Sequence, residues 1–248
     1  MTALLRSELF KQRSTRTDLG LFAGMLGLVV LAVLLHGFGL PAENIAGASD
    51  QLMVFGRGEF LGALFAALLG AMSITAEIRH GTIRPTFLVS PWRGRVVAAK
   101  VWVSTLIGAG FGLAASTLAA GVGTATLAAR GIDVQLNGGD YALLLAGGAA
   151  AAALWAAIGV GLGAVVRSQV PTIVGISAWL LFVEGLLVGD ITGVADVGRF
   201  APGALGMAAS GQEPDTLLAP AVGVGLLALY AVAAAAAGWV ATTRRDVV

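Results

Sequence analysis

The residues that could do chemistry are few, and one stretch of the sequence gathers a group of them. The segment "AEIRHGTIRPTFLVSPWRGRVVAAK", residues 76–100, carries many positive charges, two prolines and two glycines in a chain that is 57% hydrophobic and 12% charged. Its charged and titratable residues are Glu77, Arg79, His80, Arg84, Arg93, Arg95 and Lys100. Charge gathered this closely is too costly to bury in hydrocarbon, so we expect the segment outside any membrane core.

The sequence lacks the motifs that would make it an enzyme acting alone. It has no G-x-x-x-x-G-K-[ST] phosphate loop, so ATP is not expected to bind this chain. It has no H-E-x-x-H pair and no cysteine, and no Ser/His/Asp arrangement can be argued from it. We therefore expect no catalytic residue, no bound cofactor, no metal site and no nucleic-acid partner.

The composition indicates a chain solvated by lipid. The mean hydropathy is +0.89, which leaves too little polar surface to cover a soluble globule of 248 residues. About 20 apolar residues in a helix cross a bilayer core. The fold class predicted is an all-α polytopic membrane protein in one transmembrane domain over 1–248, with spans near 19–38, 60–76, 101–127, 141–166, 170–189 and 217–240.

The distribution of Lys and Arg predicts the orientation. If the N-terminus is cytoplasmic, the inner loops and ends hold twelve basic residues: Arg6, Lys11, Arg13, Arg16, Arg79, Arg84, Arg93, Arg95, Lys100, Arg167, Arg244 and Arg245. The outer loops then hold three: Arg57, Arg130 and Arg199. Because basic residues favour the cytoplasmic side, we expect a multi-pass protein of the cell membrane with both termini cytoplasmic. His36 and His80 then lie on opposite sides and cannot share a metal ion.

Two further segments need placing. Residues 197–209, "VGRFAPGALGMAA", are apolar but too short to cross, and they are broken by Pro202 and Gly203. This pattern predicts a re-entrant or interfacial helical segment before the last span. Residues 1–17 can place Leu5, Leu9 and Phe10 on one helical face and charges on the others. They are expected to form an interfacial helix on the membrane surface, or otherwise a solvated tail.

The charged stretch contains a coupling loop, residues 78–95, with a short helix inside it. Gly81 can end the second span, and Thr82 can cap a new helix. Pro85 then falls in the first turn, where its missing N–H has no effect. Pro91 disfavours helix at the preceding residue. The sequence thus predicts a helix of about two turns over 82–89.

A helix this short is unstable alone in water, because nucleation is costly and few hydrogen bonds follow. Ile83 and Phe87 are four residues apart and share one face of it. The helix must therefore pack against something. Two occupants remain open: lipid headgroups, which the arginines would meet, or a protein partner, which the proline breaks and the apolar pair favour.

Three strings resemble one family of membrane proteins. "EIRHGTIRPTFLVSPWRGRVVAAK", "SELFKQRSTRT" before the first span and "TTRRDV" near the C-terminus are similar to permease subunits of type-2 ATP-binding-cassette (ABC) exporters, especially those of actinobacterial type. The resemblance implies that the helix after the second span seats in a groove of a separate ATP-binding subunit, which carries the ATP and Mg. It also implies a dimer with a second permease copy or a related permease. The coupling residues it implies are Glu77, Arg79, Gly81, Thr82, Ile83, Arg84, Pro85 and Phe87.

One carboxylate stands well inside a span. Glu184, in "WLLFVEGLLVGD", falls in the outer half of the fifth. Intramembrane carboxylates often line a substrate or ion path. The alternatives are that Glu184 reaches outward or pairs with Arg199.

The function expected is the substrate path of an ABC exporter for a hydrophobic or amphipathic compound: a drug, an antibiotic peptide or a lipid. The scarcity of charge in the spans makes a sugar or free ion a poorer candidate. Two alternatives remain: a secondary transporter or channel that uses Glu184, and a membrane protein that binds a partner and transports nothing.

Overall fold

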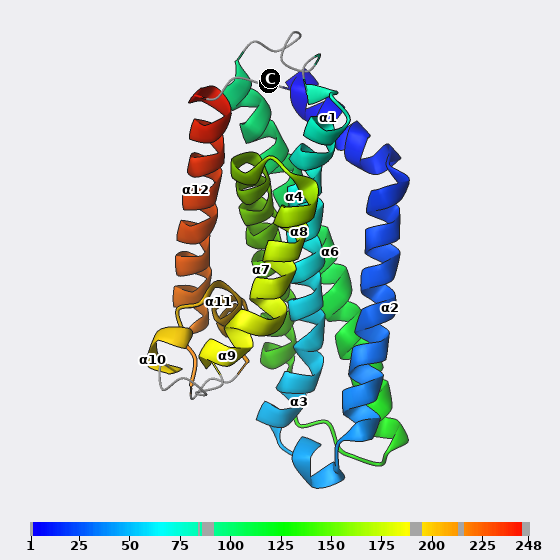
Figure 1. The fold of residues 1–248 in the computed structure, drawn as a ribbon. Helices are drawn as coiled ribbons and strands as arrows, with labels where there is room; N and C mark the ends of the chain where they lie inside the picture. Colours follow the sequence, from blue (N-terminus) through cyan, green and yellow to red (C-terminus); the bar gives the residue numbers. More distant parts are fainter. Residues whose placement is uncertain (1, 84, 86–91, 189–194, 213–215, 245–248) are drawn as a thin grey trace.

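Six helical segments dominate the computed structural model, which describes residues 2–83, 85, 92–188, 195–212 and 216–244 (Figure 1). Within these residues six segments are long and apolar enough to cross a membrane: Arg16–Gly39, Ala48–Arg79, Arg93–Ala129, Gly138–Val166, Gln169–Leu186 and Pro220–Arg244. Each predicted span falls on one of them. The described residues contain no strand. The chain is an all-α, multi-pass membrane protein, as its composition predicts.

The spans are built from the following elements. They are α2 (Arg16–Gly39), α3 (Ala48–Phe55) followed by α4 (Arg57–Arg79), α6 (Arg93–Ala129), α7 (Gly138–Val166), α8 (Gln169–Ala178) with the π turn Trp179–Val183 and α9 (Glu184–Val188), and α12 (Pro220–Arg244). A single-turn helix, Ala42–Ile45, joins α2 to α3. The second span therefore begins well before the predicted residue 60, because α3 and α4 follow one another with one residue between them.

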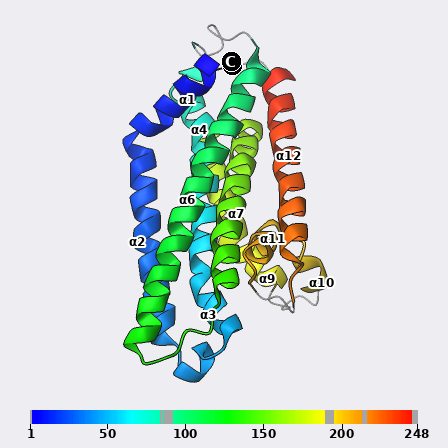
Figure 2. The same ribbon diagram turned by 180° about the vertical axis from the view of Figure 1, so that it is seen from behind.

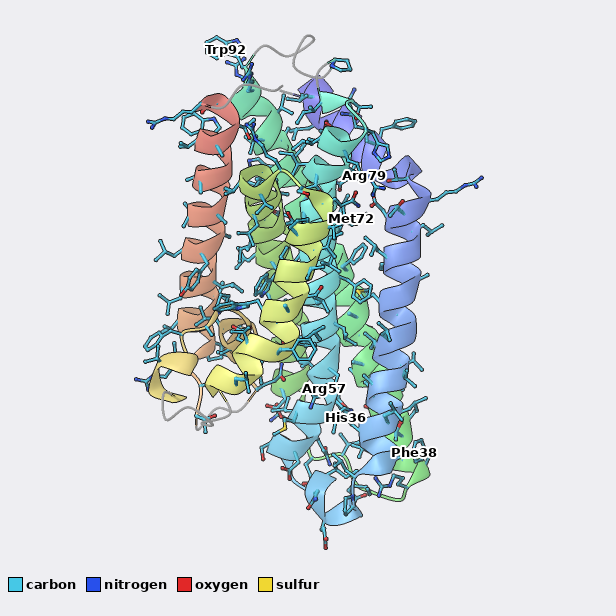
Figure 3. All side chains as sticks on the ribbon, in the orientation of Figure 1. His36, Phe38, Arg57, Met72, Arg79 and Trp92 are labelled. Carbon is cyan, nitrogen blue, oxygen red and sulfur yellow. The ribbon has the colours of Figure 1, made fainter. Side chains whose placement is uncertain are left out.

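The spans run alternately up and down, so the charged loops separate to two ends of the bundle. Figure 3 shows Arg79 and Trp92 toward one end and His36 and Arg57 toward the other. The end that carries α1 (Thr2–Ser14) is called the α1 end, and the end that carries α3 is called the α3 end (Figure 1). Ten of the twelve basic residues assigned to the cytoplasm by charge counting are described, and they belong to segments of the α1 end; the other two, Arg84 and Arg245, lie outside the described residues.

Helix α7 is the centre of the bundle and packs on α4, α6 and α12 (Figure 2). Small residues let these helices approach closely. A side chain at Gly159 would overlap the carbonyl of Ala67 in α4, and one at Gly112 of α6 would overlap the carbonyl of Gly148 in α7. Close helix contact of this kind replaces the hydrophobic effect as the source of packing in lipid.

The segment before the last span forms two helical pieces, α10 (Ala195–Gly198) and α11 (Pro202–Ala209). Helix α11 packs on α12, α7 and α4, and its Leu205 is fully buried. The predicted segment 197–209 is thus mainly helical, with a break at residues 199–201 before Pro202 begins α11, and α11 is inserted into the α3 end of the bundle (Figures 1 and 2).

Candidate functional site

Four charged side chains form a buried ion-pair cluster at the α1 end: Glu8, Lys11, Glu77 and Lys100. Lys100 of α6 is only 1% exposed. Its Nζ donates to Glu8 Oε2, to Glu77 Oε1 and to the carbonyl of Ser73, each at 2.8 Å. An ammonium has three N–H donors, so the hydrogen-bonding capacity of Lys100 is filled.

Lys11 of α1 lies on the solvent-exposed side of the cluster and contacts both carboxylates. Its Nζ lies 2.7 Å from Glu8 Oε1 and 2.9 Å from Glu77 Oε1. Glu8 therefore accepts from both lysines, one on each oxygen, and Glu77 Oε1 accepts from both as well. Two positive and two negative charges balance, which is the condition for keeping charged groups away from water.

The cluster shifts the pKa of two of its members. Burial alone would raise the pKa of Glu8, but the charges and hydrogen bonds of Lys100 and Lys11 outweigh it and hold that pKa below the ordinary value of 4.5. Burial would lower the pKa of Lys11, but its hydrogen bonds to Glu8 and Glu77 raise it above 10.5. Both side chains are therefore charged over the physiological pH range.

The N-terminal helix is tied to the bundle through its polar face. Besides Glu8, which is 1% exposed, Gln12 is buried and donates from Nε2 to Ser104 Oγ of α6 at 3.0 Å. Phe10 is 73% exposed on the other side. The charges on α1 were expected to face away from the membrane surface; the structure instead uses Glu8 to hold α1 on α4 and α6.

A cavity of about 530 Å³ lies beside the cluster. Its lining includes all four charged residues, together with Gln12, Met72 and His80. It reaches Thr82, at the start of the predicted coupling helix. Glu77 Oε2 is buried and has no hydrogen-bond partner among the described residues.

The first four predicted coupling residues, at the end of α4 and just after it, are described in full. Glu77 belongs to the ion-pair cluster, and Arg79 Nη1 donates to Gln169 Oε1 of α8 at 3.2 Å. Both residues therefore lie where the second span meets the loop. Gly81 has a φ of +70°, a conformation in which glycine is favoured, and α4 ends just before it as predicted. Thr82 donates from its hydroxyl to the carbonyl of Glu77 at 3.4 Å.

The remaining coupling residues are only partly described. Ile83 and Pro85 are helical, and Pro85 is exposed. Arg84, Phe87 and the rest of the predicted helix over 82–89 lie outside the described residues. Ile83 is 4% exposed and packs with Ile74, Val97 and Ala164 of this chain. The side chain of Ile83 thus belongs to the core of the α1 end, and the prediction that it shares a docking face with Phe87 stays a prediction, because Phe87 lies outside the described residues.

Glu184 lies at the α3 end of the fifth span and is 5% exposed. Its Oε1 accepts from the backbone N–H of Gly203 at 2.5 Å, at the start of α11. The N-cap residue of that helix, Ala201, offers no side-chain oxygen, so Glu184 caps α11 from another element. The alternative of a pair with Arg199 is not what the structure shows, since the Arg199 guanidinium lies over the ring of Phe200.

A second buried carboxylate, Glu59, was not predicted from the sequence. Glu59 of α4 is 2% exposed, and its Oε2 accepts from Gln212 Nε2 at 3.3 Å. Gln212 also donates to Ser210 Oγ at 2.7 Å. With Glu184 at its first turn and Glu59 beside its last, α11 is held at both ends by carboxylates of other spans. The predicted second span begins at residue 60, which left Glu59 outside it, whereas α4 begins at Arg57.

No protein-family model matches this sequence, and no curated protein matches it.

Proposed function

We propose that this chain is the transmembrane permease subunit of an ABC exporter, powered by a separate ATP-binding subunit. The family resemblance of three strings suggests it, and the buried ion-pair cluster beside the coupling loop is the observation that supports it most. A second permease copy or a related permease would complete the substrate path. ATP and Mg would bind the partner subunit.

The cluster suits a chain that receives force at its coupling loop. Ser73 and Glu77 precede the loop, Lys100 follows it, and Glu8 and Lys11 lie on α1. A displacement of the loop would thus reach the end of α4, the start of α6 and α1 together. Buried ion pairs resist separation because breaking one leaves an unpaired charge in low dielectric. Movement of the ATP-binding subunit would in this way tilt several spans at once.

The orientation belongs to the same proposal. The sequence count of twelve basic residues in the inner loops and ends, against three in the outer loops, supports a cell-membrane protein with the α1 end and both termini in the cytoplasm. The ATP-binding subunit would then meet the coupling loop from the side where ATP is made. The cargo would be hydrophobic or amphipathic, since the spans offer little charge to bind a polar solute.

A secondary transporter or channel that uses Glu184 is a less favoured hypothesis. The Glu184 carboxylate already accepts a hydrogen bond from the backbone N–H of Gly203 at the start of α11, which gives a structural reason for the burial of Glu184. A partner protein that transports nothing is the other alternative, and it would share the coupling loop but need no substrate path.

The experiment is purification of the chain from its native membrane in mild detergent. We expect a protein with a phosphate loop to co-purify, and the complex to hydrolyse ATP at a rate that apolar compounds change. Transport by the chain alone in proteoliposomes without ATP would overturn the proposal in favour of a secondary transporter. A complex that hydrolyses ATP but moves no compound would favour the non-transporting alternative.

A further inference from the structure

A basic groove of about 590 Å³ lies at the α1 end, between the start of α6 and the last turns of α12. On α6 it is lined by Trp92, Arg93 and Arg95, and on α12 by Trp239 and Thr243. Figure 3 shows Trp92 at this end of the bundle. None of the described residues that line the groove is acidic, so its two guanidinium groups give it a positive charge.

The two arginines of the basic groove suit an anion with several oxygens. Arg95 is exposed, and its Cζ lies 5.1 Å from the centre of the Trp92 ring. Stacking of this kind uses the flat face of a guanidinium, whereas its N–H donors lie in its plane and match two oxygens of a phosphate. Arg93 is the first residue of α6, and the first turn of that helix holds no acidic residue. The helix dipole therefore adds to the attraction for a negative charge.

Two tryptophan rings flank the guanidinium groups. Trp92 and Trp239 are 66% and 51% exposed, although both are large apolar side chains. The indole of Trp239 packs directly on α6, because a side chain at Gly94 would overlap it. Tryptophan is enriched where membrane meets water, since its ring is apolar and its N–H is polar. The pair thus indicates that the basic groove lies at the level of the lipid headgroups.

An exposed apolar strip continues from the basic groove toward the middle of the membrane. Helix α6 has 37 residues and is about 55 Å long at 1.5 Å per residue, so it is longer than a hydrocarbon core of about 30 Å. Trp102 and Leu106 follow Arg95 on the same helical face, about two and three turns further along. They are 68% and 67% exposed. A molecule with a phosphate in the groove could therefore lay an apolar chain along this strip.

We propose that the basic groove binds an anionic phospholipid, with its phosphate on the guanidinium groups of Arg93 and Arg95 and an acyl chain along Trp102 and Leu106. Basic pockets between spanning helices are suited to such headgroups. A soluble phosphate would use the arginines but leave the apolar strip uncovered. A second copy of the chain is a poorer occupant, because the α1 end that it would present is basic as well. The site concerns the lipid around the chain and does not rest on the proposed function.

Binding is tested on the full chain in phosphatidylcholine nanodiscs without any ATP-binding subunit. The probes are a phosphatidylglycerol and a phosphatidylcholine, each a minor component, with the same photoreactive diazirine in the acyl chain close to the glycerol. Cross-linked residues are mapped by mass spectrometry. At Ala98, Trp102 and Trp239 we expect adducts of phosphatidylglycerol to exceed those of phosphatidylcholine about tenfold or more. The excess should be smaller at Leu19 of α2, which is 70% exposed at the same end.

Two variants and a matched control separate a site from general attraction. Arg93→Gln/Arg95→Gln should lower the excess of phosphatidylglycerol in the groove about tenfold or more. Arg6→Gln/Arg16→Gln is the control, because it removes two exposed arginines from the same end without changing the lining of the groove. It should change the excess by less than about twofold, since these charges are screened by salt. Arg95→Lys keeps the charge but loses the planar fork, and should lower the excess about two- to tenfold.

Equal losses in the two double variants, or an excess at Leu19 as large as in the groove, would overturn the site and leave only the attraction of a basic surface for anionic lipid. If inorganic phosphate abolishes the excess when it replaces chloride at constant ionic strength, the occupant is a soluble phosphate and the lipid assignment is wrong. If Arg93→Gln/Arg95→Gln loses the ATP-binding subunit but keeps the parental excess, the groove belongs to a protein interface instead. Should that variant not fold, Arg95→Lys decides, and an unchanged excess in it would overturn the site.

Discussion

Lys100 and Glu8 stand 92 residues apart in the sequence, yet Nζ of one lies 2.8 Å from Oε2 of the other, and the two side chains are 1% and 2% exposed. This pair joins the N-terminal helix to the start of α6. Removing one partner of a buried pair leaves an uncompensated charge, which is more damaging than removing both. The cluster is therefore expected to dominate the stability of the α1 end.

Lys100→Met should lower the free energy of unfolding by about 3–5 kcal/mol, because Glu8 and Glu77 would both lose a buried partner. Lys11→Met is the matched control in the same cluster. Lys11 is 44% exposed, so its removal should lower the free energy by only about 0.2–1 kcal/mol. Denaturant unfolding in detergent measures both. In the double variant Glu8→Gln/Lys100→Met the loss should be smaller than the sum of the two single losses. A strictly additive double variant would contradict direct pairing.

The docking of α1 should depend on pH at both extremes. The folded pKa of Glu8 lies below its ordinary 4.5, so its contribution is present above that value and is lost as pH falls through the folded pKa. The folded pKa of Lys11 lies above 10.5, so its contribution is present below that value and is lost as pH rises through the folded pKa. The groups that face them are Lys100 and Glu77. Between these limits α1 should stay docked.

A nitroxide attached at Ser7→Cys, an exposed position on α1, reports this docking by its mobility in electron paramagnetic resonance. The chain has no cysteine of its own, so the label has one site. Mobility should rise only below about pH 4.5 and above about pH 10.5. A Glu8→Gln chain should be mobile across the whole range. A transition near neutral pH would show that some other group controls the helix.

The parts of this fold that the sequence predicts are those set by local composition. Runs of about 20 apolar residues mark spans wherever they occur, so the six spans can be found one at a time. The Glu8–Lys100 pair has no such local signal, because it depends on which helices meet. Glu59 was missed because the apolar run starts after it, while the spanning segment starts at Ala48 and its helix α4 at Arg57. Ile83 and Phe87 share a helical face by spacing, but spacing does not say whether that face turns inward.

The orientation can be tested with single cysteines at exposed positions of the two ends. Ser49 and Asn137 lie in segments of the α3 end, and Thr243 lies in the last turn of α12 at the α1 end. With intact cells, Ser49→Cys and Asn137→Cys should react with a membrane-impermeant maleimide. Thr243→Cys should react only with a permeant one. Labelling of Thr243→Cys from outside by the impermeant reagent would invert the topology.

Glu184 should behave as a cap for α11. Glu184→Gln keeps an oxygen that can accept from Gly203, so folded yield and transport should be close to those of the parent chain. Glu184→Leu removes the acceptor and should destabilise the protein by about 0.5–2 kcal/mol. Thermal unfolding and yield in detergent measure the difference. If the Gln variant folds normally but exports a different set of compounds, the carboxylate lines the substrate path after all.

The coupling loop gives the sharpest contrast, between two residues four positions apart. If the proposed coupling is right, Phe87→Ala should weaken binding of the proposed ATP-binding subunit by about 2–4 kcal/mol, the usual cost of truncating an aromatic anchor at an interface. That is a loss of affinity of about 30- to 1,000-fold. Arg84→Glu should weaken the same contact with a stronger dependence on salt.

Ile83→Ala should act differently, because Ile83 packs on Ile74 and Val97 of its own chain. It should lower the stability of the isolated chain by about 2–5 kcal/mol and leave the affinity of the folded fraction unchanged. Partner pull-down and ATPase activity of the reconstituted complex, beside thermal unfolding of the chain alone, separate these effects. Should the Phe87 and Arg84 variants bind the partner and hydrolyse ATP like the parent, the loop is a basic turn at the membrane surface, and the proposed coupling site is wrong.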